Sequence, residues 1–147
     1  MASTTLRAVV AIAIAFTLAA CSQLFGPSFY ETIPHKIEEA DIGVTRTLVG
    51  GATDIDRRCE GIGVTIRMEE PTVTARQLDT VLAIIQPEIA GIRECYIAVN
   101  AETVDLEPIS LAPAAAELGL ASEWLAPAHG GLVFSRDALD SVYGGEK

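Results

Sequence analysis

One segment constrains the fold of this chain more than any other: residues 74–90 carry a single apolar stripe with helical spacing. Thr74 and Gln77, three positions apart, form a capping box that marks the start of a helix. Pro87 shortens its last turn and Gly91 provides a stop. Such a helix has to bury its stripe against a second layer. The stripe consists of Leu78, Val81, Leu82, Ile85 and Ile89.

The segments on either side of this helix alternate as half-buried strands do, which identifies the second layer as a β-sheet. Residues 62–69 place an apolar side chain at every second position and end at Pro71. Residues 94–101 do the same after the helix, with Cys95, Ile97, Val99 and Ala101 on one side. The chain is therefore predicted to pack helix 74–90 against a sheet that contains both strands.

A β-hairpin is predicted before the first of these strands. Residues 42–49 and 52–59 flank Gly50-Gly51, a pair suited to a two-residue turn. Pairing across that turn sorts the side chains into an apolar and a polar face. Between residues 60 and 63 the apolar parity switches, which predicts a bulge or bend. The apolar face holds Ile42, Val44, Leu48, Ile55 and Cys59, and the polar face holds Gly43, Thr45, Thr47, Asp54, Asp56 and Arg58.

Shorter elements are expected in the C-terminal third of the chain. Residues 113–124 read as a short helix ended by Pro127, residues 132–134 as a strand, and residues 135–143 as a helix capped by Ser135. The predicted class is α+β: a small antiparallel sheet of about four or five strands, packed mainly by helix 74–90, with short C-terminal helices.

The N-terminus reads as an export signal. After one positive charge at Arg7, residues 8–20 form an apolar run broken only by Thr17. At about 1.5 Å per residue the run covers about 20 Å, less than the roughly 30 Å of a bilayer's hydrocarbon core. Its length fits the apolar region of a secretory signal.

Leu18-Ala19-Ala20-Cys21 at the end of this run resembles the lipobox of bacterial lipoprotein precursors. The resemblance implies that Cys21 receives acyl chains such as palmitate and that residues 1–20 are removed. Two or three acyl chains hold a protein stably on a membrane, which one chain does not. Ser22 in place of aspartate implies sorting to the outer membrane, facing the periplasm. The alternatives are an ordinary cleaved signal peptide or an uncleaved anchor helix.

The remaining chain divides into a lipidated tether over residues 21–34 and a single domain over residues 35–147. Gly26, Pro27 and Pro34 interrupt regular structure in the tether. As a flexible coil it would span about 20 Å. Its aromatic residues either sit in the membrane interface or pack back onto the domain; they are Phe25, Phe29 and Tyr30.

The cysteine count agrees with lipidation. With Cys21 acylated, Cys59 and Cys95 form an even pair in an oxidising compartment, as one disulfide requires. A Cys59–Cys95 bridge would close a loop of about 36 residues and contribute roughly 3–4 kcal/mol. Two buried, reduced cysteines are the alternative.

The charge of the mature chain excludes a nucleic-acid partner. Without Arg7, nine basic residues face 20 acidic ones, so the net charge is 9 − 20 = −11. Such a surface repels phosphate backbones and anionic lipid headgroups.

The residues that carry chemistry in enzymes and metal sites are sparse. No zinc-ligand spacing, nucleophile elbow, phosphate-binding loop or CxxC motif is present in the sequence, and no cofactor is expected. Asp54, Asp56 and Glu60 are the best candidates for a divalent cation, but Arg58 shares their strand face and favours a salt-bridged, solvated surface. The two histidines, His35 and His129, are isolated in loops.

Three function classes follow. The leading hypothesis is a non-enzymatic, membrane-anchored envelope lipoprotein that binds another envelope protein or helps an assembly. The second is a periplasmic ligand- or cation-binding domain, with its pocket between the sheet and the helices. The third is a hydrolase that pairs His129 with a carboxylate of Asp54, Asp56 or Glu60, which requires the histidine within hydrogen-bond reach of the carboxylate in a cleft.

Overall fold

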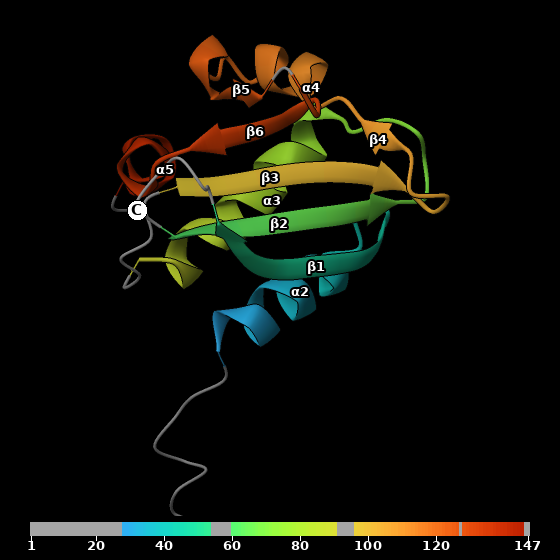
Figure 1. Ribbon diagram of the computed structural model, residues 1–147, viewed down its shortest axis with the longest axis horizontal. Coiled ribbons are helices and arrows are strands. Elements are labelled where there is room, and N and C mark those ends of the chain that lie inside the picture. Colours follow the sequence, from blue (N-terminus) through green and yellow to red (C-terminus); the bar gives the residue numbers. More distant parts are fainter. Residues whose placement is uncertain (1–27, 54–59, 91–95, 127, 146–147) are drawn as a thin grey trace, which may run out of the picture.

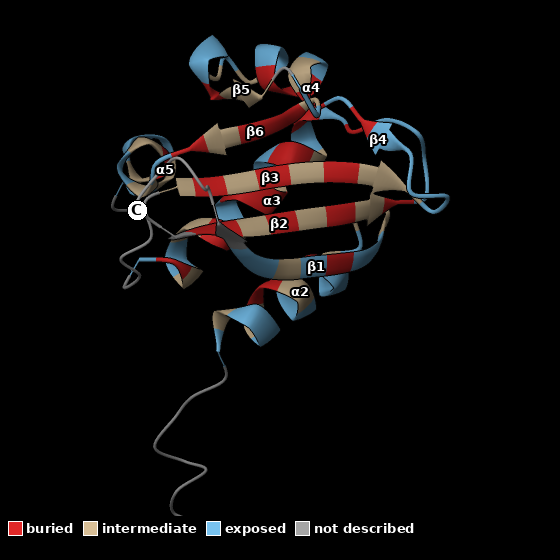
Figure 2. Ribbon diagram, viewed as in Figure 1, coloured by how far each residue is buried: buried red, intermediate tan, exposed pale blue. Residues whose placement is uncertain are grey.

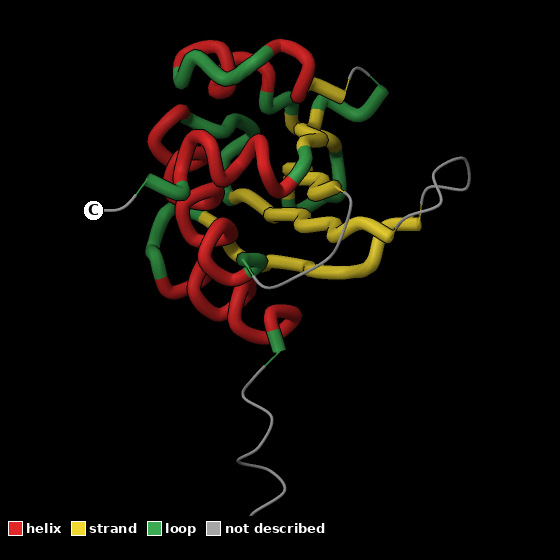
Figure 3. The backbone as a smooth tube through the Cα atoms, turned by 90° about the vertical axis from the view of Figure 1, so that its left-hand side faces the viewer, coloured by secondary structure: helices red, strands yellow, loops and turns green. Residues whose placement is uncertain are grey.

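A mixed β-sheet with its main helices packed on one face is the architecture of the protein (Figures 1 and 3). The computed structural model describes residues 28–53, 60–90, 96–126 and 128–145. The elements follow one another as α2 (Phe29–Glu39), β1 (Val44–Thr53), β2 (Glu60–Met68), α3 (Ala75–Glu88), β3 (Tyr96–Thr103), β4 (Pro108–Ile109), α4 (Ala112–Glu117), η1 (Ser122–Trp124), β5 (Leu125–Ala126), β6 (Gly131–Phe134) and α5 (Arg136–Tyr143).

The predicted α+β class is confirmed, but the sheet is mixed rather than purely antiparallel. The strand order is β1-β2-β3-β6-β5, and β4 also pairs with β3. The central pair β2–β3 is parallel, and the other pairs are antiparallel. The reason lies in the connection, because α3 carries the chain from the carboxyl end of β2 back to the end of the sheet where β2 begins, as a parallel crossover must.

Helix α3 is the predicted main helix. Thr74 accepts a hydrogen bond from the Gln77 backbone N–H, and the Gln77 side chain accepts one from the Thr74 backbone N–H, so the capping box is complete. Pro87 lies in its last turn. All five residues of the predicted stripe are buried, at 0–1% exposure. They contact the inner side chains of β2 and β3, which are Ile62, Val64, Ile66, Met68, Ile97, Val99 and Ala101.

The predicted hairpin with a turn at Gly50-Gly51 is wrong. Strand β1 runs straight through both glycines, which pair with Gly63 and Ile62 of β2. The two strands of the hairpin are therefore β1 and β2, and the connection falls in residues 54–59, outside the described part. The bend predicted at residues 60–63 is also wrong, since β2 is continuous from Glu60. Adjacent glycines occur both in two-residue turns and, as here, inside a strand, so the pair alone does not specify a turn.

The predicted faces of β1 are reversed after its first residues. Thr47, expected on the polar face, is 5% exposed, whereas Leu48, expected in the core, is 43% exposed. The cause is a bulge: the register with β2 shifts between Val44 and Arg46. One extra residue, Thr45, moves every later side chain of β1 to the other face.

The last part of the predicted tether, residues 29–34, belongs to helix α2, which begins at Phe29. Pro34 lies inside this helix rather than ending it. Ile33 and Ile37 are fully buried against the sheet and α3, and their burial stabilises the helix despite the proline. Phe29 packs partly against the core, as one of the two alternatives for the aromatic residues supposed, while Tyr30 is exposed.

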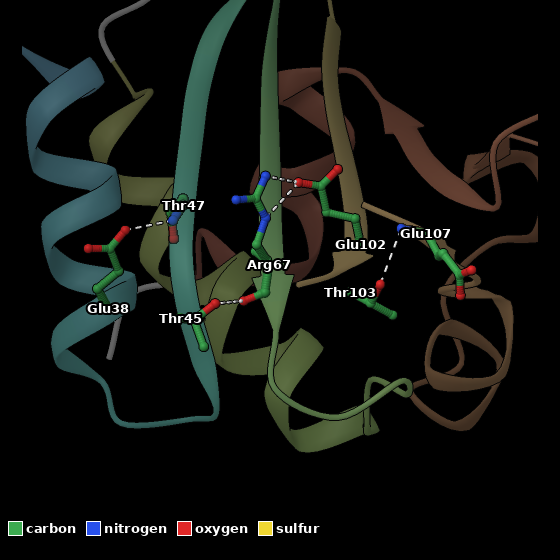
Figure 4. Close-up of polar contacts among 7 residues, drawn as sticks. All are labelled: Glu38, Thr45, Thr47, Arg67, Glu102, Thr103 and Glu107. Carbon is green, nitrogen blue, oxygen red and sulfur yellow. Dashed lines mark hydrogen bonds and ion pairs between the residues drawn. The ribbon is translucent and has the colours of Figure 1, made fainter. Parts of the chain in front are cut away.

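Helix α2 also covers the edge of the sheet. Strand β1 is an edge strand, and a Glu38 carboxylate oxygen of α2 accepts a hydrogen bond from the Thr47 backbone N–H at 2.6 Å (Figure 4). An uncovered edge offers unpaired N–H and C=O groups to other chains. The Glu38 contact removes one of them.

The C-terminal elements close the core. The predicted helix over residues 113–124 is split into α4 and η1, because Gly119 adopts a positive φ of 69°. Helix α5 has the predicted Ser135 cap. The Tyr143 hydroxyl of α5 donates to Asp79 of α3 at 2.9 Å, and burial, together with this carboxylate, raises the pKa of Tyr143. In the described ranges, none of the helices combines the length and the apolar character needed to span a bilayer.

Candidate functional site

The sheet has one face that no described helix covers, and we call it the open face. Its side chains alternate with the buried ones along each strand, as the bands of Figure 2 show. In Figure 1 this face is turned toward the reader, with α2 and α3 behind the sheet. The open face is formed by Arg46, Leu48 and Gly50 of β1, Gly61, Gly63, Thr65 and Arg67 of β2, Tyr96, Ala98, Asn100 and Glu102 of β3, and Val133 of β6.

The register of the strands arranges these residues in rows across the sheet. One row, here called the small-residue row, contains Gly50, Gly63, Ala98 and Val133, which are mutual neighbours on four adjacent strands. Small side chains leave the backbone close to the surface, so another molecule can approach it closely. In the neighbouring row, the Tyr96 ring lies over its register partner Gly61, where an added Cβ would come within 2.4 Å of the ring.

A row of charged residues lies nearer the carboxyl ends of β2 and β3. The Arg67 Nε and Nη2 atoms donate to one carboxylate oxygen of Glu102 at 3.0 and 2.6 Å (Figure 4). Both side chains are 21% exposed, so this ion pair is only partly screened by water. Arg46 is the register neighbour of Arg67 on the other side. Two like charges face each other there, and Glu102 balances one of them.

A shallow hollow of about 250 Å³ lies beside the charged row. It is lined by Thr65 of β2, Asn100 of β3, Pro108 of β4 and His129 of the β5–β6 turn, among others. Asn100, one of its lining residues, packs closely over Gly131. An added Cβ at Gly131 would lie 2.2 Å from the Asn100 Oδ1 atom. The full lining is Thr65, Asn100, Ala101, Glu102, Pro108 and His129.

Most of the site residues expected from the sequence fall outside the described ranges. Cys21, Cys59, Cys95, Asp54 and Asp56 belong to the segments that the structure does not describe. The lipidation, the disulfide and the carboxylate cluster therefore stay predictions. Glu60 forms the first residue of β2, and its side chain is outside the description.

The two histidines have different surroundings. His35 pairs with Glu39 one turn later on α2 at 3.3 Å, and both side chains are well exposed. His129 reaches the hollow. Among the described residues, no carboxylate lies within ion-pair distance of His129. No group of three or more metal-ligating side chains occurs in the described ranges either.

The sequence did not predict that the residues of the open face come together on one surface. Arg67 and Glu102 occupy outward positions of two strands predicted separately, and only the parallel register brings them together. Asn100 could have been placed on this face from the sequence, because it is a polar residue at an outward position of a strand whose other face is fully apolar. Such a residue between buried neighbours points to the exposed side of the sheet.

The chain matches no known protein-family model, and neither a curated protein nor a solved structure is similar to it.

Proposed function

We propose that this protein is a lipid-anchored, non-enzymatic component of the bacterial cell envelope that binds a partner protein through the open face of its sheet. The observation that carries this proposal is the small-residue row on a sheet face without a helix over it. A nearly flat strip of backbone and small side chains fits the flat surface of another protein. An apolar centre with arginine beside it is typical of protein interfaces.

The charge pattern defines the partner further. Arg46 is exposed and makes no ion pair with a described residue. It lies at the border of the open face of a protein with an acidic surface. An acidic side chain of the partner would meet Arg46 there, whereas a basic partner would be drawn to the rest of the surface. The proposed partner therefore has a small apolar patch with a carboxylate beside it.

The size of the open face implies a weak contact that the anchor strengthens. Four strands about 4.8 Å apart are about 19 Å wide, and eight residues of β3 extend about 26 Å, which gives roughly 500 Å². A standard interface buries about 800 Å² on each partner. Lipid on Cys21 would confine the domain to the membrane surface. It would thus raise the local concentration of neighbouring proteins, which compensates for modest affinity.

The partner contact is tested with a lysine in the small-residue row. Full-length protein carrying Ala98→Lys is compared with wild type and with Val142→Lys, which alters an exposed valine of α5. Each is cross-linked in native envelopes and its cross-linked proteins are quantified by mass spectrometry. For each protein that cross-links to wild type, we expect the cross-linked amount to fall at least about fivefold with Ala98→Lys. With Val142→Lys the amount should stay at the wild-type level. An unchanged set with a folded Ala98→Lys protein would contradict the proposal.

The anchor is tested separately. Cys21→Ser is expected to remove the acyl groups and release the protein from sedimented membranes. The intact mass of wild type should correspond to residues 21–147 plus its lipid. A mass that retains the first twenty residues, or a free thiol at Cys21, would rule out lipidation.

A further inference from the structure

The hollow on the open face differs in chemistry from the rest of that face. Its lining combines polar side chains, such as Thr65 and Asn100, with the apolar ring of Pro108. Glu102 is its only acidic residue, and Arg67 balances that charge. Because no unbalanced carboxylate or fixed cation lines it, the hollow does not select strongly for an ion. It suits a ligand that forms many hydrogen bonds without carrying charge.

Asn100 is the best placed group for such a ligand. No hydrogen bond joins its side-chain amide to any other residue in the described ranges. The amide is half-buried and packs directly over Gly131, where even a methyl group would collide with it. Its orientation is therefore limited while its two donors and its acceptor remain available. A half-buried amide without a partner is favourable only where water or a ligand completes its hydrogen bonds.

The other lining groups match the same kind of ligand. Thr65 and His129 each offer both a donor and an acceptor, and Glu102 keeps a second carboxylate oxygen beyond the one that Arg67 occupies. Each hydroxyl of a sugar also donates and accepts at the same time. The ring of Pro108 gives the C–H face of a sugar an apolar surface. At about 250 Å³ the hollow is smaller than the roughly 300–1,000 Å³ of drug-sized pockets, so one or two sugar rings are the appropriate size.

We infer that this hollow binds a neutral saccharide, with Asn100 as the residue that recognises its hydroxyl groups. This inference stands apart from the partner contact, since it uses the residues that line the hollow, whereas the partner contact uses the small-residue row and Arg46. The cross-linking test of the partner contact and the saccharide titration can therefore give independent results.

The test is an NMR titration of the full-length protein in a zwitterionic detergent, which has no sugar headgroup. The ligands are glucose, N-acetylglucosamine and its disaccharide, and spermidine serves as a cationic comparison. We expect a saccharide to shift the resonances of Asn100, Thr65 and Gly131 in a saturable way. Asn100→Ala and Thr65→Val should weaken binding about tenfold or more, because each removes hydrogen bonds to the ligand. Thr80→Val, an equivalent change on α3 away from the hollow, should leave it unchanged.

Two results would overturn the inference. One is that no saccharide produces saturable shifts at the hollow in the wild-type protein, whether or not spermidine does. The other is that saccharide binding keeps its full affinity in Asn100→Ala. Thermal melting of each variant establishes that it is folded, and Thr65→Val keeps a β-branched side chain in the strand, so it tests the same site with little risk to folding.

Discussion

Two strand glycines, Gly131 and Gly50, illustrate how the same residue serves different purposes in this sheet. At Gly131 an added Cβ would lie 2.6 Å from the Val99 carbonyl oxygen, a backbone atom that cannot move away without disturbing β3. At Gly50 nothing lies within 4 Å of an added Cβ, and its φ is not positive. Gly131 is required by close approach of neighbouring strands, whereas Gly50 is not required for the fold.

This difference predicts opposite effects of alanine. Gly131→Ala should lower the free energy of unfolding by about 1–3 kcal/mol, as overpacking does. Gly50→Ala should leave it unchanged or raise it by up to about 1 kcal/mol, because alanine restricts the unfolded chain. Urea denaturation of both variants measures the effects. Equal destabilisation by the two substitutions would contradict the close contact at Gly131.

Thr47 carries a buried hydroxyl without a partner. Its Oγ1 atom is inaccessible and makes no hydrogen bond in the described part of the chain. The bulge at Thr45 turned this polar side chain toward the core. Valine has nearly the same shape and no hydroxyl to desolvate.

Thr47→Val should therefore raise the free energy of unfolding by up to about 1 kcal/mol. Thr45→Val is the matched control. The Thr45 hydroxyl donates to the Arg67 carbonyl at 3.2 Å, so its loss should be neutral or slightly destabilising. The urea midpoints of both variants decide the matter, and a lower midpoint for Thr47→Val would show that its hydroxyl is satisfied.

At the scale of secondary structure, helix α2 is fastened to the end of α3 through one carboxylate. Glu88 of α3 accepts a hydrogen bond from the Thr32 hydroxyl at 2.7 Å and forms an ion pair with Lys36. These two contacts, led by Lys36, hold the pKa of Glu88 below its usual value. The Glu88 side chain is 16% exposed and that of Lys36 is 52% exposed, so solvent screens the pair in part.

Because the pKa of Glu88 is lower in the folded than in the unfolded chain, the stabilisation is complete above pH of about 4.5 and is lost as the pH falls through the folded-state pKa. Glu88→Gln should lower the free energy of unfolding by about 0.5–1 kcal/mol at neutral pH. The difference from wild type should shrink as the pH falls below about 4.5 and through the folded-state pKa of Glu88. Urea denaturation at a series of pH values from neutral downward measures it. Glu70→Gln, in an exposed turn, should match wild type throughout, and a pH-independent loss in Glu88→Gln would contradict the charge effect.

The elements that could be predicted from the sequence are those whose local signals agree with their tertiary surroundings. Helix α3 and strand β3 have unbroken periodicity, and their buried residues are the expected ones. Strand β1 could not be placed correctly, because the bulge at Thr45 reverses its faces and leaves no local signal. At Pro34 the sequence predicted an interruption, but the chain is helical there, since burial of Ile33 and Ile37 outweighs the local preference against a helix.

At the scale of the whole molecule, the open face could not be foreseen from the sequence. It depends on the parallel pairing of β2 with β3, which brings Arg67 beside Glu102 and Thr65 beside Asn100. These pairs are 35 residues apart in the chain. Separate strand patterns give the direction of each side chain but not its neighbour on the next strand. His129 was singled out as an isolated residue, and only the β5–β6 turn places it near Asn100.

The position of α2 predicts where the N-terminus can be shortened. A chain that begins at Ser28 keeps the whole helix and should unfold cooperatively at the same temperature as the chain from Cys21. A chain that begins at Asp41 loses Ile33 and Ile37, each of which contributes about 1.5–3 kcal/mol through burial, and leaves the Thr47 N–H unpaired. It should lose cooperative melting by circular dichroism and associate in sedimentation experiments. A monomeric, cooperatively folded chain from Asp41 would contradict this role of α2.

The contact between Glu38 and Thr47 has a mechanical consequence. Helix α2 is the first described element of the chain, and seven residues, at most about 25 Å long when extended, separate it from Cys21. Any force that a lipid at Cys21 transmits to the domain would act on α2 before it reaches a strand. The Thr47 N–H is the group on this edge that such a force would expose, because it becomes available to another strand only once Glu38 has been pulled away.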